Sequence, residues 1–191
     1  SGAQVRAHHN HNFSEENKLG NVEIPEKEKL KPFIQRDLAV LEALGHKVNR
    51  NTPTSLFVSK DESSWAQSEF EKIEVKKPIL ALGLGASRPA KIWPIEYFAH
   101  VSKAWALQTG GSVVAFVSGA ELSLAKEWKA LLPGKEFQIA SSYSVSQVMA
   151  LISESIVFLG NDSGPRHMAA ALGLPTVTMY GPQDPFECHP Y

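Results

Sequence analysis

The chain carries a polar, glycine-rich segment, Gly160-Asn-Asp-Ser-Gly-Pro-Arg-His167, between two apolar segments. The run 155–159 before it predicts a buried strand, and residues 168–172 after it predict a helix that ends at Gly173. A second apolar run, 175–180, indicates another strand. Such a turn leaves backbone N–H groups at a helix start, where the helix dipole favours an anion. The segment therefore predicts a site for a phosphate-bearing ligand.

The same alternation of strand and helix patterns begins near residue 77. Further strands are expected at 78–82, 113–117 and 137–139, and further helices at 94–108, 119–132 and 144–152. Strands and helices joined by short glycine-rich turns predict an α/β fold, a Rossmann-like parallel sheet with helices on both faces. Ligands of such sheets bind at the carboxyl ends of the strands. The turns 83–93, 118–121 and 160–167 should therefore share one rim.

Residues 1–75 form a separate N-terminal segment in this interpretation. Two helices are expected in it, one from Pro32 to Gly45 and one over residues 61–73. A histidine cluster at 8, 9 and 11 could hold a transition metal, but an exposed linker is the more common outcome for such a cluster. No Cys or Asp lies at ligand spacing beside it, so we assign no metal site.

Bulk composition excludes several classes of protein. The chain has 191 residues and a net charge of −1, which argues against a nucleic-acid partner. Its single cysteine, Cys188, excludes an internal disulfide framework and fits a reducing, cytoplasmic compartment. No apolar run approaches the roughly 20 residues that span a bilayer, so we expect at most peripheral contact with a membrane.

Two charged residues in the first two turns each allow two interpretations. Lys91 follows the small-residue turn Gly83-Leu-Gly-Ala-Ser87 and is either a surface lysine or a point charge for a diphosphate. Glu121 begins a helix and either complements the helix dipole or accepts hydrogen bonds from ribose hydroxyls.

The third turn brings Asp162, Ser163 and His167 close together, but it does not match a serine hydrolase. The segment is not G-x-S-x-G, and these positions are too tightly spaced for a catalytic triad. Ser163 is more simply a helix N-cap. His167, one turn into the helix, is either a donor to a phosphate oxygen or a structural histidine.

Three motifs in this order resemble glycosyltransferase family 9, the heptosyltransferases of lipopolysaccharide core synthesis. They are Gly85-Ala-Ser-Arg-Pro-Ala-Lys-Ile-Trp-Pro94, Gly119-Ala-Glu121, and the segment 160–167 continued by Ala169-Ala-Ala-Leu-Gly-Leu-Pro175 and Gly181-Pro-Gln-Asp-Pro185. The likeness covers residues 77–191. It implies a GT-B architecture, in which residues 76–191 are the C-terminal, donor-binding half, truncated at its C-terminus. Residues 1–75 would be a remnant of the acceptor domain with the linker.

The resemblance implies inverting, metal-independent transfer of heptose from ADP-L-glycero-D-manno-heptose to the lipopolysaccharide inner core, with no cofactor. It also implies individual roles in donor binding. Ser87 would bind the phosphates, Lys91 the diphosphate and sugar, Glu121 the ribose and Asp162 the heptose hydroxyls; the N–H groups of Ser163 and Gly164, with His167, would bind a phosphate, and Val145 and Met149 would lie near the adenine. Positive charge and the helix dipole would then stabilise the leaving diphosphate.

The resemblance places the general base, an Asp, and the acceptor surface in the first domain. We therefore expect no catalytic residue in this chain, and donor binding without sugar transfer by the chain alone. A non-catalytic, Rossmann-like nucleotide-binding module is the alternative. A dinucleotide oxidoreductase is a third possibility, but G-x-G-x-x-G would need glycine where Arg88 stands.

Overall fold

The computed structural model describes residues 7–8, 22–23, 32–182 and 184–188. The chain divides into two compact units, which are residues 1–53 with 183–189 and residues 54–182. The described elements of the first unit are β1 (Ala7–His8), β2 (Val22–Glu23), α1 (Phe33–Ala43) and α7 (Pro185–Cys188). The side chains of the histidine cluster at 8–11 lie outside the described part. No helix among the described residues is long and apolar enough to cross a membrane.

The second unit is built on one parallel sheet. Its strands are β3 (Leu80–Gly83), β4 (Val113–Phe116), β5 (Phe137–Ala140), β6 (Val157–Asn161) and β7 (Thr176–Met179). They lie in the order β5-β4-β3-β6-β7, and every neighbouring pair is parallel. In sequence order, β4 and β5 are added on one side of β3, and β6 and β7 are then added on the other side of β3. A topological switch point therefore lies between β3 and β6.

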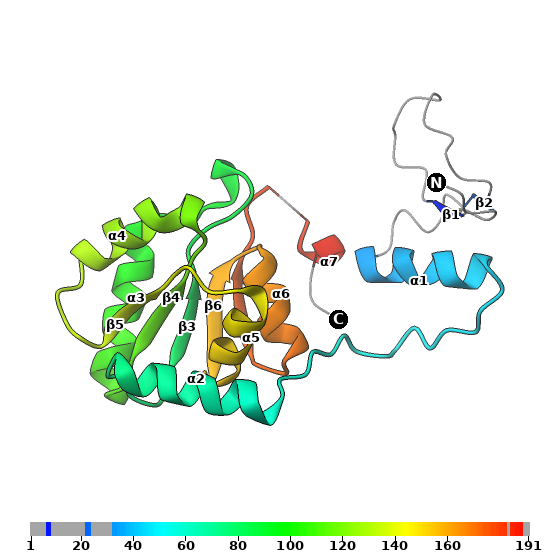
Figure 1. Cartoon of the computed structure of the whole chain (residues 1–191). Helices are drawn as coiled ribbons and strands as arrows, with labels where there is room; N and C mark the ends of the chain where they lie inside the picture. The colour runs from blue at the N-terminus through cyan, green and yellow to red at the C-terminus, as the bar shows by residue number, and fades with distance from the viewer. Residues whose placement is uncertain (1–6, 9–21, 24–31, 183, 189–191) are drawn as a thin grey trace. The chain divides into compact units, whose positions relative to one another are not determined.

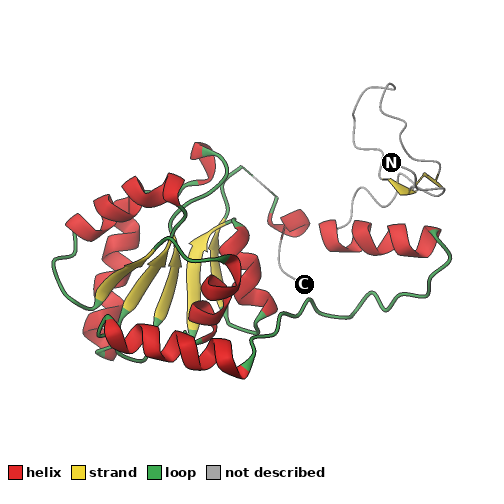
Figure 2. Cartoon of the chain, in the orientation of Figure 1, coloured by secondary structure: helices red, strands yellow, loops and turns green. Residues whose placement is uncertain are grey.

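Helices cover both faces of this sheet. They are α2 (Lys60–Lys72), η3 (Pro89–Lys91), α3 (Ile95–Thr109), η4 (Gly119–Glu121), α4 (Leu122–Ala130), α5 (Val145–Ser153) and α6 (Gly164–Ala171). In Figures 1 and 2, α3 and α4 lie on one face, and α2, α5 and α6 lie on the other. The predicted α/β fold, with a Rossmann-like parallel sheet and helices on both faces, is confirmed.

Two apolar clusters form the core, one on each face of the sheet. Ala81 of β3 is in register with Val114 and Phe158, and all three are buried on the face of α2, α5 and α6. The next residue of each strand points to the other face, where Leu82 packs with Phe98 of α3 and Trp128 of α4. Because both faces are buried, the strands read as continuous apolar runs rather than alternating ones.

Helix α2 belongs to the second unit, although the sequence pattern groups it with residues 1–75. It begins with a capping box, in which Ser59 Oγ accepts from the Glu62 N–H at 3.2 Å and Glu62 Oε2 accepts from the Ser59 N–H at 2.8 Å. Its Ala66 and Phe70 are buried in the core beneath the sheet. The compact unit therefore begins near residue 54, before this helix.

Candidate functional site

A pocket of about 570 Å³ opens beyond the carboxyl ends of β3, β4 and β6. Its lining comes from all three predicted turns and from the start of α5. The lining residues are Ala86, Ser87, Lys91, Phe116, Val117, Ser118, Glu121, Tyr143, Val145, Val148, Asp162, Ser163, Gly164, Pro165, His167 and Met168. The single rim predicted for the three turns is therefore present, and it lies at the switch point where α/β sheets bind ligands.

A larger cavity, of about 910 Å³, lies at the opposite end of the strands, beside their amino ends. Most of its lining comes from residues 74–76, 110–112 and 131–137, which precede β3, β4 and β5, and the rest comes from α2 and α3. None of the three motifs contributes to its lining. Since ligands of parallel sheets bind at the carboxyl ends, we assign the functional site to the smaller pocket.

Glycines let the turns approach one another at this rim. A Cβ on Gly85 would lie 1.7 Å from Glu121 Oε1, so only glycine leaves room for that carboxylate. A Cβ on Gly181, after β7, would lie 2.8 Å from the Cα of Lys91. The loop after β3 therefore lies against Glu121, which follows β4, and against Gly181, which follows β7.

Asn161 joins two of the turns from within the protein. Its side chain is fully buried, its Nδ2 donates to the Leu84 carbonyl at 2.8 Å, and its Oδ1 accepts from the Trp93 N–H at 3.0 Å. Both bonds reach from the end of β6 to the loop after β3, which contains Lys91. Asn161 belongs to the motif 160–167, but the sequence carries no signal for this structural role.

Asp162 is the centre of the charged groups in the pocket. Its Oδ2 accepts from Lys91 Nζ at 2.8 Å, and its Oδ1 accepts from Arg166 Nη2. The three side chains are largely buried, with exposed fractions of 7% for Asp162, 11% for Lys91 and 0% for Arg166. Arg166 also lies with its Cζ 5.5 Å from the centre of the Tyr180 ring. One carboxylate therefore has two cationic partners.

These partners control the ionisation of Asp162. Burial alone would raise the pKa of Asp162, but the hydrogen bonds from Lys91 and Arg166 and their charges outweigh it and hold the pKa below its usual value. Asp162 is therefore ionised at neutral pH.

His167 is neutral at neutral pH. Burial lowers the pKa of its imidazole, and the positive charge of Arg166 lowers it further. Arg166 Nη2 lies 2.9 Å from His167 Nε2. A guanidinium only donates hydrogen bonds, so Nε2 must accept and the ring proton must lie on Nδ1. The imidazole thus keeps one N–H that can donate to a ligand.

Ser163 occupies the N-cap position of α6, as predicted, but its side chain does not cap the helix. Its hydroxyl donates instead to the Asn161 carbonyl at 3.2 Å. The first-turn N–H groups of an α-helix have no partners within the helix, so those of α6 can bind an anion at the pocket edge. With its hydroxyl in this bond, and His167 Nε2 facing Arg166, Ser163 has no geometry for a triad.

Glu121 both caps a helix and lines the pocket. Its Oε2 accepts from the Ser118 N–H and from the Ser118 hydroxyl, both at 2.9 Å, which closes a capping box at η4. The same carboxylate lines the pocket, with Oε1 against Gly85. Ser87 also lines this pocket, and it is exposed to solvent.

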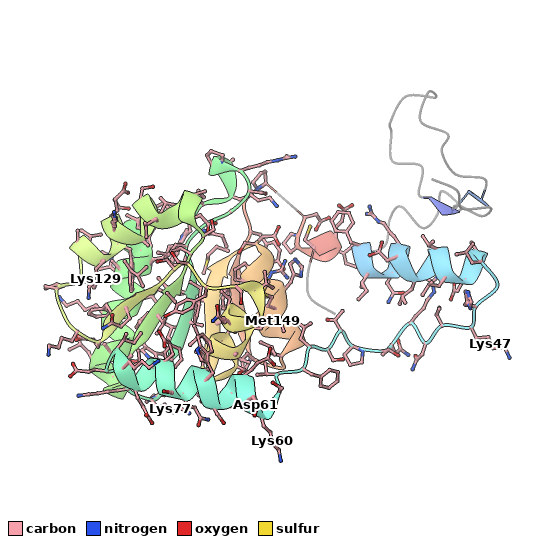
Figure 3. All side chains as sticks on the ribbon, viewed as in Figure 1. Lys47, Lys60, Asp61, Lys77, Lys129 and Met149 are labelled. Atoms are coloured by element: carbon pink, nitrogen blue, oxygen red, sulfur yellow. The ribbon has the colours of Figure 1, made fainter. Side chains whose placement is uncertain are left out.

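The side of the pocket formed by α5 is more apolar. Of the two residues expected near the adenine, Val145 lines this side, whereas Met149 is not among the lining residues, although it lies on the same helix (Figure 3). Val148 and Tyr143 line it instead, and neither was predicted. Tyr143 donates to Glu69 Oε1 at 2.8 Å, and burial together with this bond raises the pKa of Tyr143 to about 12, so its ring is neutral.

Arg166 is the charged residue of the site that the sequence interpretation missed. A cation four positions after Asp162 was a usable signal, because a residue just before a helix lies close to the first turn of that helix. Its burial could not be inferred from the sequence, because arginine is almost always exposed unless it is paired.

Comparison with known proteins identifies the family of this chain. The model of glycosyltransferase family 9 (heptosyltransferase) matches residues 6–191. Lipopolysaccharide heptosyltransferase 2 of Salmonella typhimurium is 33% identical over 135 residues, which are 68% of this chain and 38% of that protein. Its Escherichia coli counterpart is 29% identical over 178 residues, 87% of this chain and 51% of that protein. The chain thus spans about half the length, or less, of these relatives.

Solved structures share the fold. The E. coli ADP-heptose LPS heptosyltransferase II has a TM-score of 0.74 and 27% identity, over 91% of this chain and 55% of that chain. A family 9 glycosyl transferase from Veillonella parvula has a TM-score of 0.79 and 24% identity, over 88% of this chain and 49% of that chain. The resemblance read from the three motifs is confirmed, and this chain belongs to glycosyltransferase family 9.

Proposed function

We propose that this chain supplies the donor-binding part of a glycosyltransferase that moves a heptose from ADP-L-glycero-D-manno-heptose to the inner core of lipopolysaccharide. The observation that carries the proposal is the convergence of the motif residues on one pocket at the switch point. Those residues are Ser87, Lys91, Glu121, Asp162, Ser163, Gly164 and His167. Membership of the family, and the named substrate of the E. coli structural relative, support heptose as the sugar.

In this proposal the diphosphate lies between Lys91 and the start of α6. Lys91 and Arg166 carry two positive charges against the single negative charge of Asp162, so this group has a net charge of +1. The N–H groups of Ser163 and Gly164 and the Nδ1–H of His167 add neutral donors. Such preorganised donors stabilise the charge that develops on a leaving diphosphate, which supports transfer without a metal.

The rest of the donor would follow the walls of the pocket. Glu121 and Ser87 would contact the ribose and the phosphates, and Asp162 would accept from heptose hydroxyls. The apolar side formed by Val145, with Met149 behind it on α5, would face the adenine. Tyr143 and Val148 extend that apolar side and can contact the same base.

Neither carboxylate of the pocket is suited to abstract a proton from an acceptor. Two cations and a lowered pKa make Asp162 a weak base, and Glu121 holds the cap of η4. We therefore propose that the general base is an Asp of the acceptor domain, outside the described residues. A base on the face opposite the leaving diphosphate would invert the anomeric centre. The lipopolysaccharide core would bind beside that base.

Ligand binding by the chain tests the proposal. In calorimetry, ADP and ADP-heptose should bind and NAD should not. Lys91→Met should weaken ADP binding at least about tenfold, because it removes a charge-assisted contact. Lys126→Met, at an exposed position of α4 that is not among the lining residues, is the matched control and should leave the affinity unchanged. Binding of NAD in place of ADP would overturn the proposal and favour an oxidoreductase.

Transfer assays separate the enzyme from the non-catalytic module. The chain should bind ADP-heptose but release no ADP in the presence of lipopolysaccharide acceptor. Adding the acceptor domain of a longer form of the protein should restore transfer. Transfer by these 191 residues alone would contradict the placement of the base, and a longer form that binds donor without ever transferring it would favour the module.

A further inference from the structure

Asp162 has more positive charge beside it than one carboxylate needs. Lys91 and Arg166 bind different oxygens of Asp162, Oδ2 and Oδ1 respectively. One cation would be enough to balance one buried carboxylate. The second cation is therefore available for another partner, provided that the first can hold Asp162 alone.

The two cations differ in their freedom to move. The Arg166 side chain is fully buried within α6, against Tyr180 and between Asp162 and His167. Lys91 is the last residue of the short η3 helix, in a loop that lines the pocket, and its four-carbon stem allows the ammonium to swing. If either cation leaves Asp162 for a ligand, it must be Lys91.

We propose that Arg166 is a positioning residue with two tasks, which are to remain as the permanent counter-ion of Asp162 and to hold His167 in its Nδ1–H tautomer. The first task releases Lys91 to an arriving diphosphate. The second keeps a neutral N–H donor in the pocket. The inference deepens the proposed donor site and rests on it for the identity of the diphosphate.

The energetic reason lies in the burial of Asp162. An ionised carboxylate that is 7% exposed is costly if it loses its only counter-ion. Without Arg166, movement of Lys91 to the ligand would create that state, so Lys91 would stay on Asp162 and the ligand would bind weakly. With Arg166 present, Lys91 can move to the ligand and the Asp162 carboxylate still keeps a counter-ion. The affinity for a diphosphate should therefore depend on Arg166 only while residue 162 is a carboxylate.

Nuclear magnetic resonance of the ligand-free protein tests the second task without any assumption about the donor. The ring nitrogen shifts of His167 should show the Nδ1–H tautomer in the parent protein. Arg166→Met removes the donor to Nε2, so the tautomer should become mixed and the pKa of His167 should rise. Lys91→Met removes the other cation and is the matched control, because Arg166 remains. An unchanged His167 tautomer in folded Arg166→Met would overturn this task.

A double-mutant cycle with ADP tests the first task. ADP carries the diphosphate but no sugar, so Asp162→Asn removes no proposed ligand contact. Arg166→Met should weaken ADP binding at least about tenfold when residue 162 is Asp, and by less than about threefold in the Asp162→Asn background. Arg88→Met, which removes an exposed arginine from the same rim, controls for general loss of charge and should have little effect.

Equal weakening in both backgrounds would mean that Arg166 binds the phosphate directly, and it would overturn the counter-ion task. Failure of the parent protein to bind ADP would overturn the proposed function, while the tautomer measurement would still decide the second task. If Arg166→Met does not fold, Arg166→Gln separates the tasks. Its side-chain amide can donate to Nε2 as Arg166 Nη2 does, but it has no charge to balance Asp162, so the Nδ1–H tautomer should persist while ADP affinity falls. Loss of both or of neither would overturn the proposal.

Discussion

At the scale of single residues, Glu121 shows how one carboxylate can cap a helix and line a pocket at the same time. Its Oε2 accepts two hydrogen bonds from Ser118, while the side chain lines the pocket beside Gly85. Glutamine also closes a capping box at this position, because its side chain can accept from the same N–H. One substitution can therefore separate the cap of η4 from the proposed contact with the ribose.

Glu121→Gln should change the free energy of unfolding by less than about 0.5 kcal/mol, since the cap is kept. It should weaken ADP binding several-fold, because a charged acceptor for the ribose hydroxyls is replaced by a neutral one. Calorimetry with ADP and with 2′,3′-dideoxy-ADP measures the difference. The parent protein should prefer ADP, and the variant should lose most of that preference. An equal preference in both proteins would show that Glu121 serves only the helix.

Asp162 should make the stability of the protein depend on acid pH. Its folded-state pKa lies below its unfolded value, so it stabilises the fold above the unfolded pKa, and this contribution is lost as the pH falls through the folded pKa. Asp162→Asn should reduce the free energy of unfolding by about 2 kcal/mol at pH 7. Urea unfolding from pH 7 to pH 3 should show the two proteins converging toward acid. A constant difference across that range would contradict the lowered pKa.

At the scale of elements, Glu154 ties the end of α5 to α2 and to the start of the sheet. Its Oε1 accepts from Ser63 Oγ at 3.0 Å and Gln67 Nε2 at 3.2 Å, and its Oε2 accepts from Lys77 Nζ at 2.8 Å. Glu154→Ala should therefore lower the free energy of unfolding by about 1–3 kcal/mol. Glu127→Ala, at an exposed position of α4, is the control. Equal urea midpoints for the two variants would show that the tie adds no stability.

Gly160 sets the spacing of β3 and β6 at the switch point. A Cβ there would lie 2.8 Å from the Gly83 carbonyl oxygen and 2.8 Å from the Phe158 ring, and the backbone oxygen cannot easily move. Gly160→Ala should destabilise the protein by about 1–3 kcal/mol through overpacking. Gly119→Ala meets no atom within 4 Å and serves as the control. Thermal unfolding would measure both, and a fully stable Gly160→Ala would show that the sheet can spread there.

At the scale of the molecule, residues 54–182 carry a complete core of their own. Both clusters, the sheet and the whole pocket lie inside this range. A protein of residues 54–182 should therefore unfold cooperatively in urea and bind ADP within about threefold of the full chain. A protein of residues 76–182, which lacks α2, exposes the apolar surface around Phe70 and should be much less stable. A non-cooperative transition for residues 54–182 would contradict this division.

Much of this organisation could be predicted from local patterns. Each strand of the sheet has its own apolar run, and the helices that pack on it have apolar residues at helical spacing. Because the carboxyl ends of parallel strands lie together, the three turns could also be placed at one end of the sheet. The partners of the charged residues could not be predicted in this way, because Lys91 and Asp162 are 71 positions apart and pair only after folding. The place of α2 was missed for a similar reason. Its neighbours come from later strands and from α5, and no local signal links them to Phe70.

The buried amide of Asn161 has a consequence for dynamics. The Trp93 N–H lies in a loop, where amide hydrogens normally exchange quickly with deuterium, but it donates to the Asn161 side chain at 3.0 Å. Its exchange should therefore follow the opening of β6 rather than the motion of the loop. Trp93 would act as a reporter of the central strands, and its protection factor would show whether the loop of Lys91 and the end of β6 open as one unit.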